Sequence, residues 1–70
     1  MVEKTIELTG TSTNSIEDAV GLAVNRASAT IQGIRTAEIK RITATVEDGT
    51  VTAWKVKMDV TFAVQERLHE

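Results

Sequence analysis

Two acidic side chains are the most suggestive chemical groups of this 70-residue sequence. If Asp48-Gly49 forms a tight hairpin turn, residues equally far from the turn face each other, and Glu38 then lies opposite Asp59. Like charges that face each other destabilise a sheet unless something compensates. Neighbouring lysines could do so. Alternatively, the two carboxylates, from several copies of the chain, could supply oxygen ligands to a hard cation such as calcium.

The other reactive residue types do not build a catalytic site. The only histidine, His69, lies near the C-terminus and is most simply a solvated tail residue. The serines and threonines of residues 9–15 lack a histidine or lysine base placed to activate them, so turn and cap roles are expected. Gly10-Thr11-Ser12 could receive an anion at a helix start, although the glycine pattern of a phosphate loop is missing. The sequence therefore predicts a protein that is not an enzyme.

Trp54, the only tryptophan, could be a platform for a flat ligand or part of the core. It alternates with polar residues in a run that also contains Val56 and Met58. A lone tryptophan in such a run usually packs, with its indole N–H reaching a partner or water. The alternation therefore predicts that Trp54 lies on the helix-facing side of a strand.

Size and composition indicate one domain, residues 1–70, that needs partners. A chain of this length buries only roughly 60% of its unfolded surface, and such chains usually recruit disulfides, a metal or copies of themselves. Cysteine is absent, so oligomerisation is the expected route to stability. The net charge of −2, with both signs scattered, predicts no nucleic-acid partner. No run approaches the roughly 18 apolar residues of a membrane span, and the N-terminus does not resemble a signal peptide, which predicts a cytoplasmic protein.

The first half of the chain predicts a strand followed by a helix. Residues 2–9 alternate between apolar and polar side chains, as in a half-buried strand. Apolar residues then recur at three- and four-residue spacing, which predicts a helix over about 15–32. Its capping box could begin at Asn14 or at Ser15. Gly33 is placed to adopt the left-handed conformation after the helix.

The second half predicts a hairpin. Residues 34–47 and 50–64 flank the turn, and a right-handed crossover gives an α+β fold, β-α-β-β, with an antiparallel sheet of order 1-3-2. One helix covers one face of this sheet, and the other face is bare. The predicted helix-side pairs are Ile39 with Met58, Ala37 with Val60 and Arg35 with Phe62; the bare-face pairs are Thr36 with Thr61, Glu38 with Asp59 and Lys40 with Lys57.

Near the turn the apolar pattern inverts. In this register, five apolar residues fall on the otherwise polar face: Ile42, Ala44, Val46, Val51 and Ala53. A bulge near residues 40–41 could flip the face. Alternatively, the hairpin outruns the helix and lays an apolar patch against another subunit. The second alternative fits the shortage of core better.

With these elements in place, the chain resembles the dodecins over essentially its whole length. The matching stretches are the first strand with Gly10-Thr11-Ser12, the helix with Arg26-Ala27 and Thr30, Glu38-Ile39, the Asp48-Gly49 turn, and Val56 through Val60-Thr61-Phe62. Dodecins are β-α-β-β proteins that assemble into hollow homododecameric shells and bind flavins, which they store or quench. The resemblance implies the same assembly, with riboflavin or FMN as ligand.

The flavin site of that family departs from its usual pattern in this chain. In dodecins a tryptophan of the second strand stacks on the flavin ring, and a glutamine of the third strand hydrogen-bonds to its edge. The matching stretches are Thr36-Ala37-Glu38-Ile39 and Trp54-Lys55-Val56, so the resemblance implies flavin-binding positions at Thr36, Glu38 and Lys55. Reduced flavin affinity is expected, because Thr36 has no ring and Lys55 donates hydrogen bonds but cannot accept them. Lys55 could instead attract a phosphate. The alternative is a structural or ion-binding variant, holding calcium for example, that binds no flavin.

Overall fold

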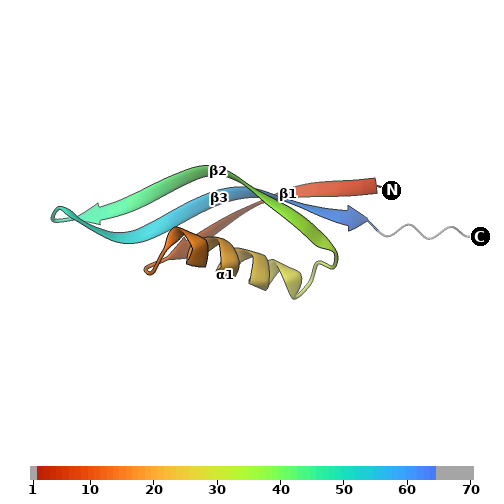
Figure 1. Cartoon of the computed structure of the whole chain (residues 1–70), viewed down its shortest axis with the longest axis horizontal. Coiled ribbons are helices and arrows are strands. Elements are labelled where there is room, and N and C mark those ends of the chain that lie inside the picture. The colour runs from red at the N-terminus through yellow and green to blue at the C-terminus, as the bar shows by residue number, and fades with distance from the viewer. Residues whose placement is uncertain (1, 65–70) are drawn as a thin grey trace, which may run out of the picture.

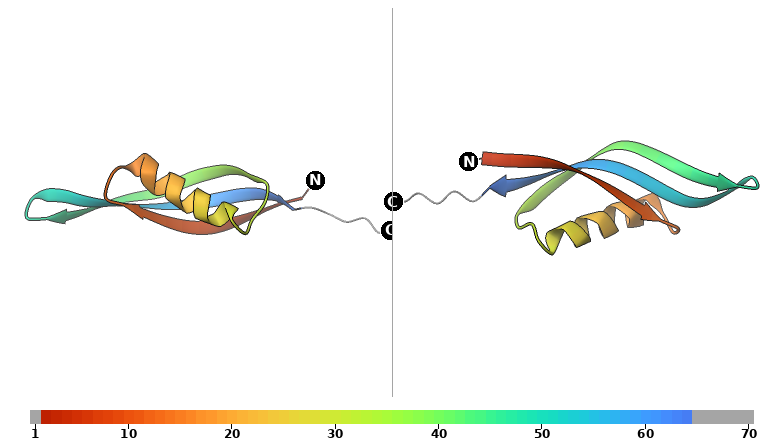
Figure 2. Two further views of the ribbon diagram at one scale, coloured as in Figure 1. Left: turned by 90° about the horizontal axis from the view of Figure 1, so that it is seen from below. Right: turned by 180° about the vertical axis from the view of Figure 1, so that it is seen from behind.

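The chain folds as strand, helix, strand, strand in a computed structural model that describes residues 2–64. The elements are β1 (Val2–Ser12), α1 (Ile16–Ser28), β2 (Ile34–Glu47) and β3 (Thr50–Val64). The strands form one antiparallel sheet in the order β1-β3-β2, and α1 lies across one of its faces (Figure 1, Figure 2). The predicted α+β fold and strand order are confirmed. His69 lies outside the described residues.

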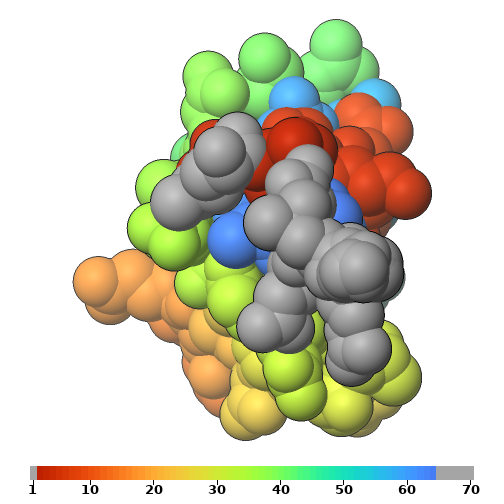
Figure 3. Space-filling model, turned by 90° about the vertical axis from the view of Figure 1, so that its right-hand side faces the viewer, coloured from red at the N-terminus to blue at the C-terminus, as the bar shows by residue number. Residues whose placement is uncertain are grey.

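The core lies between α1 and the central strand β3. Seen end-on, the helix forms one layer and the strands form the other (Figure 3). Ala19 of α1 and Val56, Met58 and Val60 of β3 are fully buried. Half-buried apolar residues surround them: Ile6, Leu8, Ile16, Val20, Ala23, Val24, Ile34 and Ala37. The helical stripe expected from the three- and four-residue spacing therefore packs on alternate residues of β3.

Ser15 begins the helix. Its hydroxyl accepts a hydrogen bond from the Asp18 backbone N–H at 2.9 Å, as an N-cap side chain does. Of the two predicted registers, the one that begins at Ser15 is therefore correct and the one at Asn14 is wrong. Buried Ser12 donates its hydroxyl to the Asp18 carboxylate at 2.6 Å and accepts the Asn14 backbone N–H at 2.9 Å. This network connects the end of β1 to the start of α1, and Glu17 and Asp18 place negative charge in the first turn of the helix.

The helix ends earlier than its sequence pattern predicts. The last helical residue is Ser28, and the Ile31 backbone N–H bonds back to the Ala27 carbonyl at 2.9 Å. Gly33 has a φ of 77°, so the predicted left-handed conformation is confirmed. However, its place is at the entry to β2, where its carbonyl accepts the Ala63 backbone N–H at 3.2 Å. Gly33 thus turns the chain into the sheet and does not cap the helix directly.

Gly10 lets β1 pass close beneath the helix. The first strand does not end at residue 9 as predicted, because β1 continues through Gly10 to Ser12. A Cβ atom at Gly10 would collide with the backbone carbonyl of Ala19 and would lie 3.0 Å from the Ala23 Cβ. The close approach of strand and helix therefore requires a residue without a side chain.

The β2–β3 turn has the predicted type I′ form, with φ values of 52° at Asp48 and 76° at Gly49. Further from the turn the register shifts three times. At each shift one strand contains a residue that has no partner on the other strand. These unpaired residues are Thr52 in β3 and Lys40 and Arg35 in β2. These bulges correct two predicted pairs. Phe62 lies opposite Ile34 and not Arg35, and Lys57 lies opposite Arg41 and not Lys40.

The bulge at Lys40 explains the inverted pattern near the turn. Because of it, Ile42 pairs with Val56 and Ala44 pairs with Trp54, which places both on the helix side of the sheet. Their predicted position on the polar face is therefore wrong, and the alternative of a face-flipping bulge is confirmed. A bulge changes which side chains reach each face because alternate residues of a strand point to opposite sides.

The hairpin also extends well beyond the helix (Figure 1). Val46 pairs with Val51, and this pair continues the helix-side face past the end of α1. Ile42, Val46 and Val51 are 45%, 59% and 45% exposed, and we call these three residues the hairpin patch. Of the five apolar residues, only Ala53, opposite Thr45, lies on the other face. The sheet therefore shows an uncovered apolar surface, on the helix side and not on the polar side.

Candidate functional site

The face of the sheet opposite α1, here called the helix-free face, is organised in rows that cross the three strands. Residues that pair directly across an antiparallel sheet share a face, so the register alone defines the rows. In the order β1, β3, β2 the rows are Thr5, Thr61 and Thr36; Glu7, Asp59 and Glu38; Thr9, Lys57 and Arg41; and Thr11, Lys55 and Thr43. A threonine row, an acidic row and a basic region thus follow one another along the sheet.

The acidic row contains the predicted pair. Glu38 lies opposite Asp59 as expected, and Glu7 extends the row on the other side of Asp59. The sequence did not single out Glu7, because the β1–β3 register is set by packing rather than by a turn. The Lys57 ammonium lies 3.4 Å from the Glu7 carboxylate, and the Lys40 ammonium lies 4.0 Å from that of Glu38. Lysines therefore offset part of the repulsion, as one of the two alternatives expected.

The acidic row of one chain does not form a complete metal site. Within residues 2–64, no three acidic, histidine or cysteine side chains come close enough together to hold an ion. Calcium takes six to eight oxygen ligands. Glu38 and Asp59 could therefore contribute to a calcium site only if further copies of the chain supplied ligands.

The three positions at which the resemblance implies flavin binding are only partly brought together. Thr36 and Glu38 are exposed neighbours on the helix-free face, in adjacent rows. Lys55 is on the same face, but Thr36 lies opposite Thr61, six residues along β3 from Lys55. At 3.3 Å per residue this separation is roughly 20 Å, which is too long for one flavin ring to touch both. A site that uses both positions needs two copies of the chain.

Trp54 lies on the helix side, as its alternation predicts. It is half-buried, next along the face to fully buried Val56, and its cross-strand neighbours are Ser12 and Ala44. Its ring is therefore separated from Lys55 by the thickness of the sheet.

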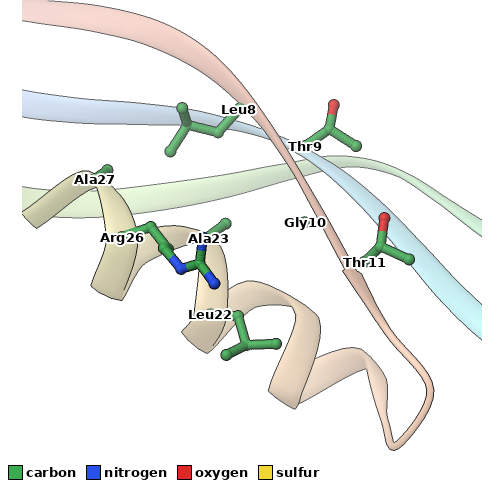
Figure 4. A pocket seen from close by; sticks show the side chains of 8 residues that line it. All are labelled: Leu8, Thr9, Gly10, Thr11, Leu22, Ala23, Arg26 and Ala27. Atoms are coloured by element: carbon green, nitrogen blue, oxygen red, sulfur yellow. The ribbon is translucent and has the colours of Figure 1, made fainter.

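A groove between β1 and α1 was not singled out from the sequence. Its volume is about 490 Å³, and Figure 4 shows its lining: Leu8, Thr9, Gly10, Thr11, Leu22, Ala23, Arg26 and Ala27. The sequence contains only a weak signal for this groove, namely that Leu22 lies off the apolar stripe of the helix. In the structure Leu22 is 44% exposed. An apolar surface beside one guanidinium suits an apolar group that carries a negative charge.

A second depression lies on the helix-free face, in the basic region. It has a volume of about 290 Å³ and is lined by Thr9, Arg41, Thr43, Lys55 and Lys57; we call it the basic hollow. A register without bulges does not reveal it, because such a register would place Arg41 and Thr43, which alternate with Lys40 and Ile42, on the helix side. All its lining side chains can donate hydrogen bonds, and three are cations.

Comparisons with known proteins agree with this fold. The dodecin family profile matches residues 2–65. A dodecin of Thermus thermophilus is 34% identical over 65 residues, which are 93% of this chain and 94% of the relative. The solved dodecin of Streptomyces coelicolor is 32% identical with a TM-score of 0.87, and 94% of each chain is covered.

A further solved relative is the calcium-chelating immunodominant antigen of Mycobacterium tuberculosis, a calcium dodecin with a novel calcium-binding site. It is 28% identical with a TM-score of 0.80, and both chains are covered completely. Among residues 2–64, the structure contains no helix with the length and apolar character of a membrane span. The fold, strand order and matched length together show that this chain belongs to the dodecin family.

Proposed function

We propose that this dodecin assembles into a homo-oligomeric shell that binds and stores a small ligand of the flavin type, without catalysing a reaction. Dodecins bind flavins and form such shells, which supports both parts of the proposal. The observation that carries it is the exposed helix-free face with Thr36, Glu38 and Lys55 on it. Twelve subunits, a single domain over residues 1–70 and a cytoplasmic location stay predictions from the sequence.

The chemistry of two positions supports weak rather than tight flavin binding. An aromatic stack contributes about 0.5–1.5 kcal/mol beyond the apolar area it covers, and Thr36 provides none. Lys55 can donate to a ring carbonyl but cannot accept from the ring N–H. Because Thr36 and Lys55 are roughly 20 Å apart in one chain, flavin binding that uses both should also depend on assembly.

Flavin fluorescence tests this proposal. Titration of the unmodified protein with riboflavin or FMN should show weak quenching, with FMN favoured if Lys55 reaches its phosphate. Thr36→Trp combined with Lys55→Gln should bind more tightly, since it restores the ring and the amide. Thr45→Trp with the same Lys55→Gln is the matched control, because it places an equal ring on the same face near the turn. Tight quenching by the unmodified protein would contradict the proposal.

Calcium binding is the second candidate function. It is favoured by the row of Glu7, Asp59 and Glu38 and by the calcium dodecin among the solved relatives. In this variant Glu38 and Asp59 from several copies would hold the ion, and the shell would have a structural or ion-binding role without flavin. Whether the protein binds flavin or calcium therefore distinguishes the two candidate functions.

A further inference from the structure

The basic hollow unites all three strands at one place. Thr9 comes from β1, Lys55 and Lys57 come from β3, and Arg41 and Thr43 come from β2. We propose that the basic hollow binds a phosphoryl group, either as free phosphate or as part of a small phosphorylated molecule. Lys55 is also one of the positions proposed for flavin, but this proposal is tested separately, because inorganic phosphate has no ring that could stack.

The bulge at Lys40 creates the hollow. Without it, Lys40 would lie opposite Lys57, and Ile42 would lie opposite Lys55. With the extra residue, Arg41 faces Lys57 and Thr43 faces Lys55. One apolar neighbour is thereby replaced by a hydroxyl, and a guanidinium joins the two ammonium groups. Bulges that re-aim side chains in this way are common beside binding and active sites.

The charges of the hollow are incompletely balanced within the chain. Arg41 and Lys57 are directly paired across the strands, an arrangement of like charges that destabilises a sheet. Lys57 has the Glu7 carboxylate at 3.4 Å. Within residues 2–64, no carboxylate lies within 4.0 Å of Arg41 or Lys55. A bound dianion would supply the missing negative charge and relieve the repulsion.

The lining selects a phosphoryl group by its donors. A guanidinium can hold two oxygens of one phosphate through parallel hydrogen bonds, while a lysine acts as a point charge. The hydroxyls of Thr9 and Thr43 add two donors at the sides of the hollow. None of the lining residues is acidic, so nothing in the lining repels an anion. A compact anion with several oxygens and two charges can accept hydrogen bonds from most of these donors. A carboxylate such as acetate has only two oxygens and leaves some donors without a partner.

The test is calorimetric titration of the full-length protein with inorganic phosphate, with chloride keeping the ionic strength constant. Saturable binding is expected, and Arg41→Gln should weaken it at least tenfold. Lys40→Gln removes the same charge from the adjacent residue, which lies beside Glu38 and not in the hollow, and should change affinity less than twofold. Lys55→Gln provides a second variant if Arg41→Gln does not fold, which circular dichroism reports.

A phosphate monoester, glycerol 3-phosphate, distinguishes the two sources of the phosphoryl group. Equal or tighter binding than phosphate assigns the hollow to phosphorylated molecules, and binding of phosphate alone assigns it to the free ion. The proposal is overturned if neither binds more tightly than acetate. It is also overturned if Lys40→Gln loses as much affinity as Arg41→Gln.

Discussion

On the helix-covered face of the sheet, Val56, Met58 and Val60 have no exposed surface, whereas Lys55 and Lys57, which alternate with them on the helix-free face, remain exposed. Alternate residues of β3 therefore have different roles: one set packs in the core and the other set is exposed on the helix-free face. Packing against α1 fixes the first set, because a buried side chain must fit its neighbours closely. No such constraint acts on the second set. A change on the helix-covered face should therefore alter stability first, and a change on the helix-free face should alter binding first.

The two faces are nevertheless linked through the bulges of the hairpin. The extra residue at Lys40 moves Ile42 to the helix side and, by the same step, moves Arg41 and Thr43 to the helix-free face. One irregularity thus removes an apolar residue from the polar surface and completes the basic hollow. Loss of the bulge would damage both faces together.

The largest effect is expected for Gly10→Ala, which strikes the helix-covered face. The added methyl group would collide with the backbone carbonyl of Ala19, so β1 and α1 would have to move apart. Overpacking of this kind costs typically about 1–3 kcal/mol, and backbone is harder to displace than a side chain. Calorimetric or circular-dichroism melting of the variant should therefore show a clear fall in Tm.

The matched control is Gly21→Ala, the same substitution on the exposed side of α1. No atom lies within 4 Å of the added Cβ there. Alanine in a helix interior is more favourable than glycine by about 0.8–1.0 kcal/mol, so this variant should be slightly more stable than the parent. If both variants shifted Tm in the same direction, the packing assigned to Gly10 would be wrong.

The hairpin patch should govern assembly. Val51→Asp places a charge within this patch, and we expect it to weaken the oligomer strongly. Thr50→Asp adds the same charge one residue away, on the helix-free side of the turn, and should weaken assembly less. Native mass spectrometry measures both. A stable monomer or dimer of the unmodified protein at micromolar concentration would contradict the assembly itself.

The elements of this fold follow from local signals in the sequence. Alternation in β1, the apolar stripe of α1 and the Asp48-Gly49 turn each depend on residues close together in the chain. The end of the helix was harder to predict. Ile31 continues the apolar period, but the chain must leave the helix early enough to reach β2 through Gly33. That requirement comes from the tertiary structure, and no residue between Ser28 and Gly33 signals the end of the helix in the sequence.

Whether a cross-strand pair of the site was predicted correctly depends on its position relative to the bulges. The extra residue at Thr52 displaces the register by one, and the extra residue at Lys40 restores it. The pairing of Glu38 with Asp59 was therefore predicted correctly, since it lies beyond both. Arg41 lies between them, and a register without bulges would place it on the helix side, the wrong face. The inverted apolar pattern signalled this irregularity and its position near residues 40–41, but the partner bulge at Thr52 depends on the packing of the whole sheet.

A smaller effect is expected for Trp54→Phe. The ring is half-buried on the helix side, so its reduction should lower the free energy of unfolding by about 1 kcal/mol, the centre of the usual range for single substitutions. Flavin affinity should not change, since Lys55 and Thr36 lie across the sheet from this ring. Thermal melting and flavin fluorescence, measured on the same preparation, separate the effect on stability from the effect on flavin affinity. Strong flavin quenching that disappears in Trp54→Phe would reverse the assignment of the two faces.

The smallest effect concerns calcium and the acidic row. If the ion binds, a concentration equal to its dissociation constant stabilises the protein by only about 0.4 kcal/mol, or roughly 2–3 °C in Tm. Asp59→Asn should abolish this increment, because Asp59 lies between Glu7 and Glu38 and is the centre of the row. Glu3→Gln removes one charge from the same face outside the row and should preserve the increment. An equal response of Asp59→Asn and the parent would leave these carboxylates as ordinary surface charges, held near Lys40 and Lys57 without a metal.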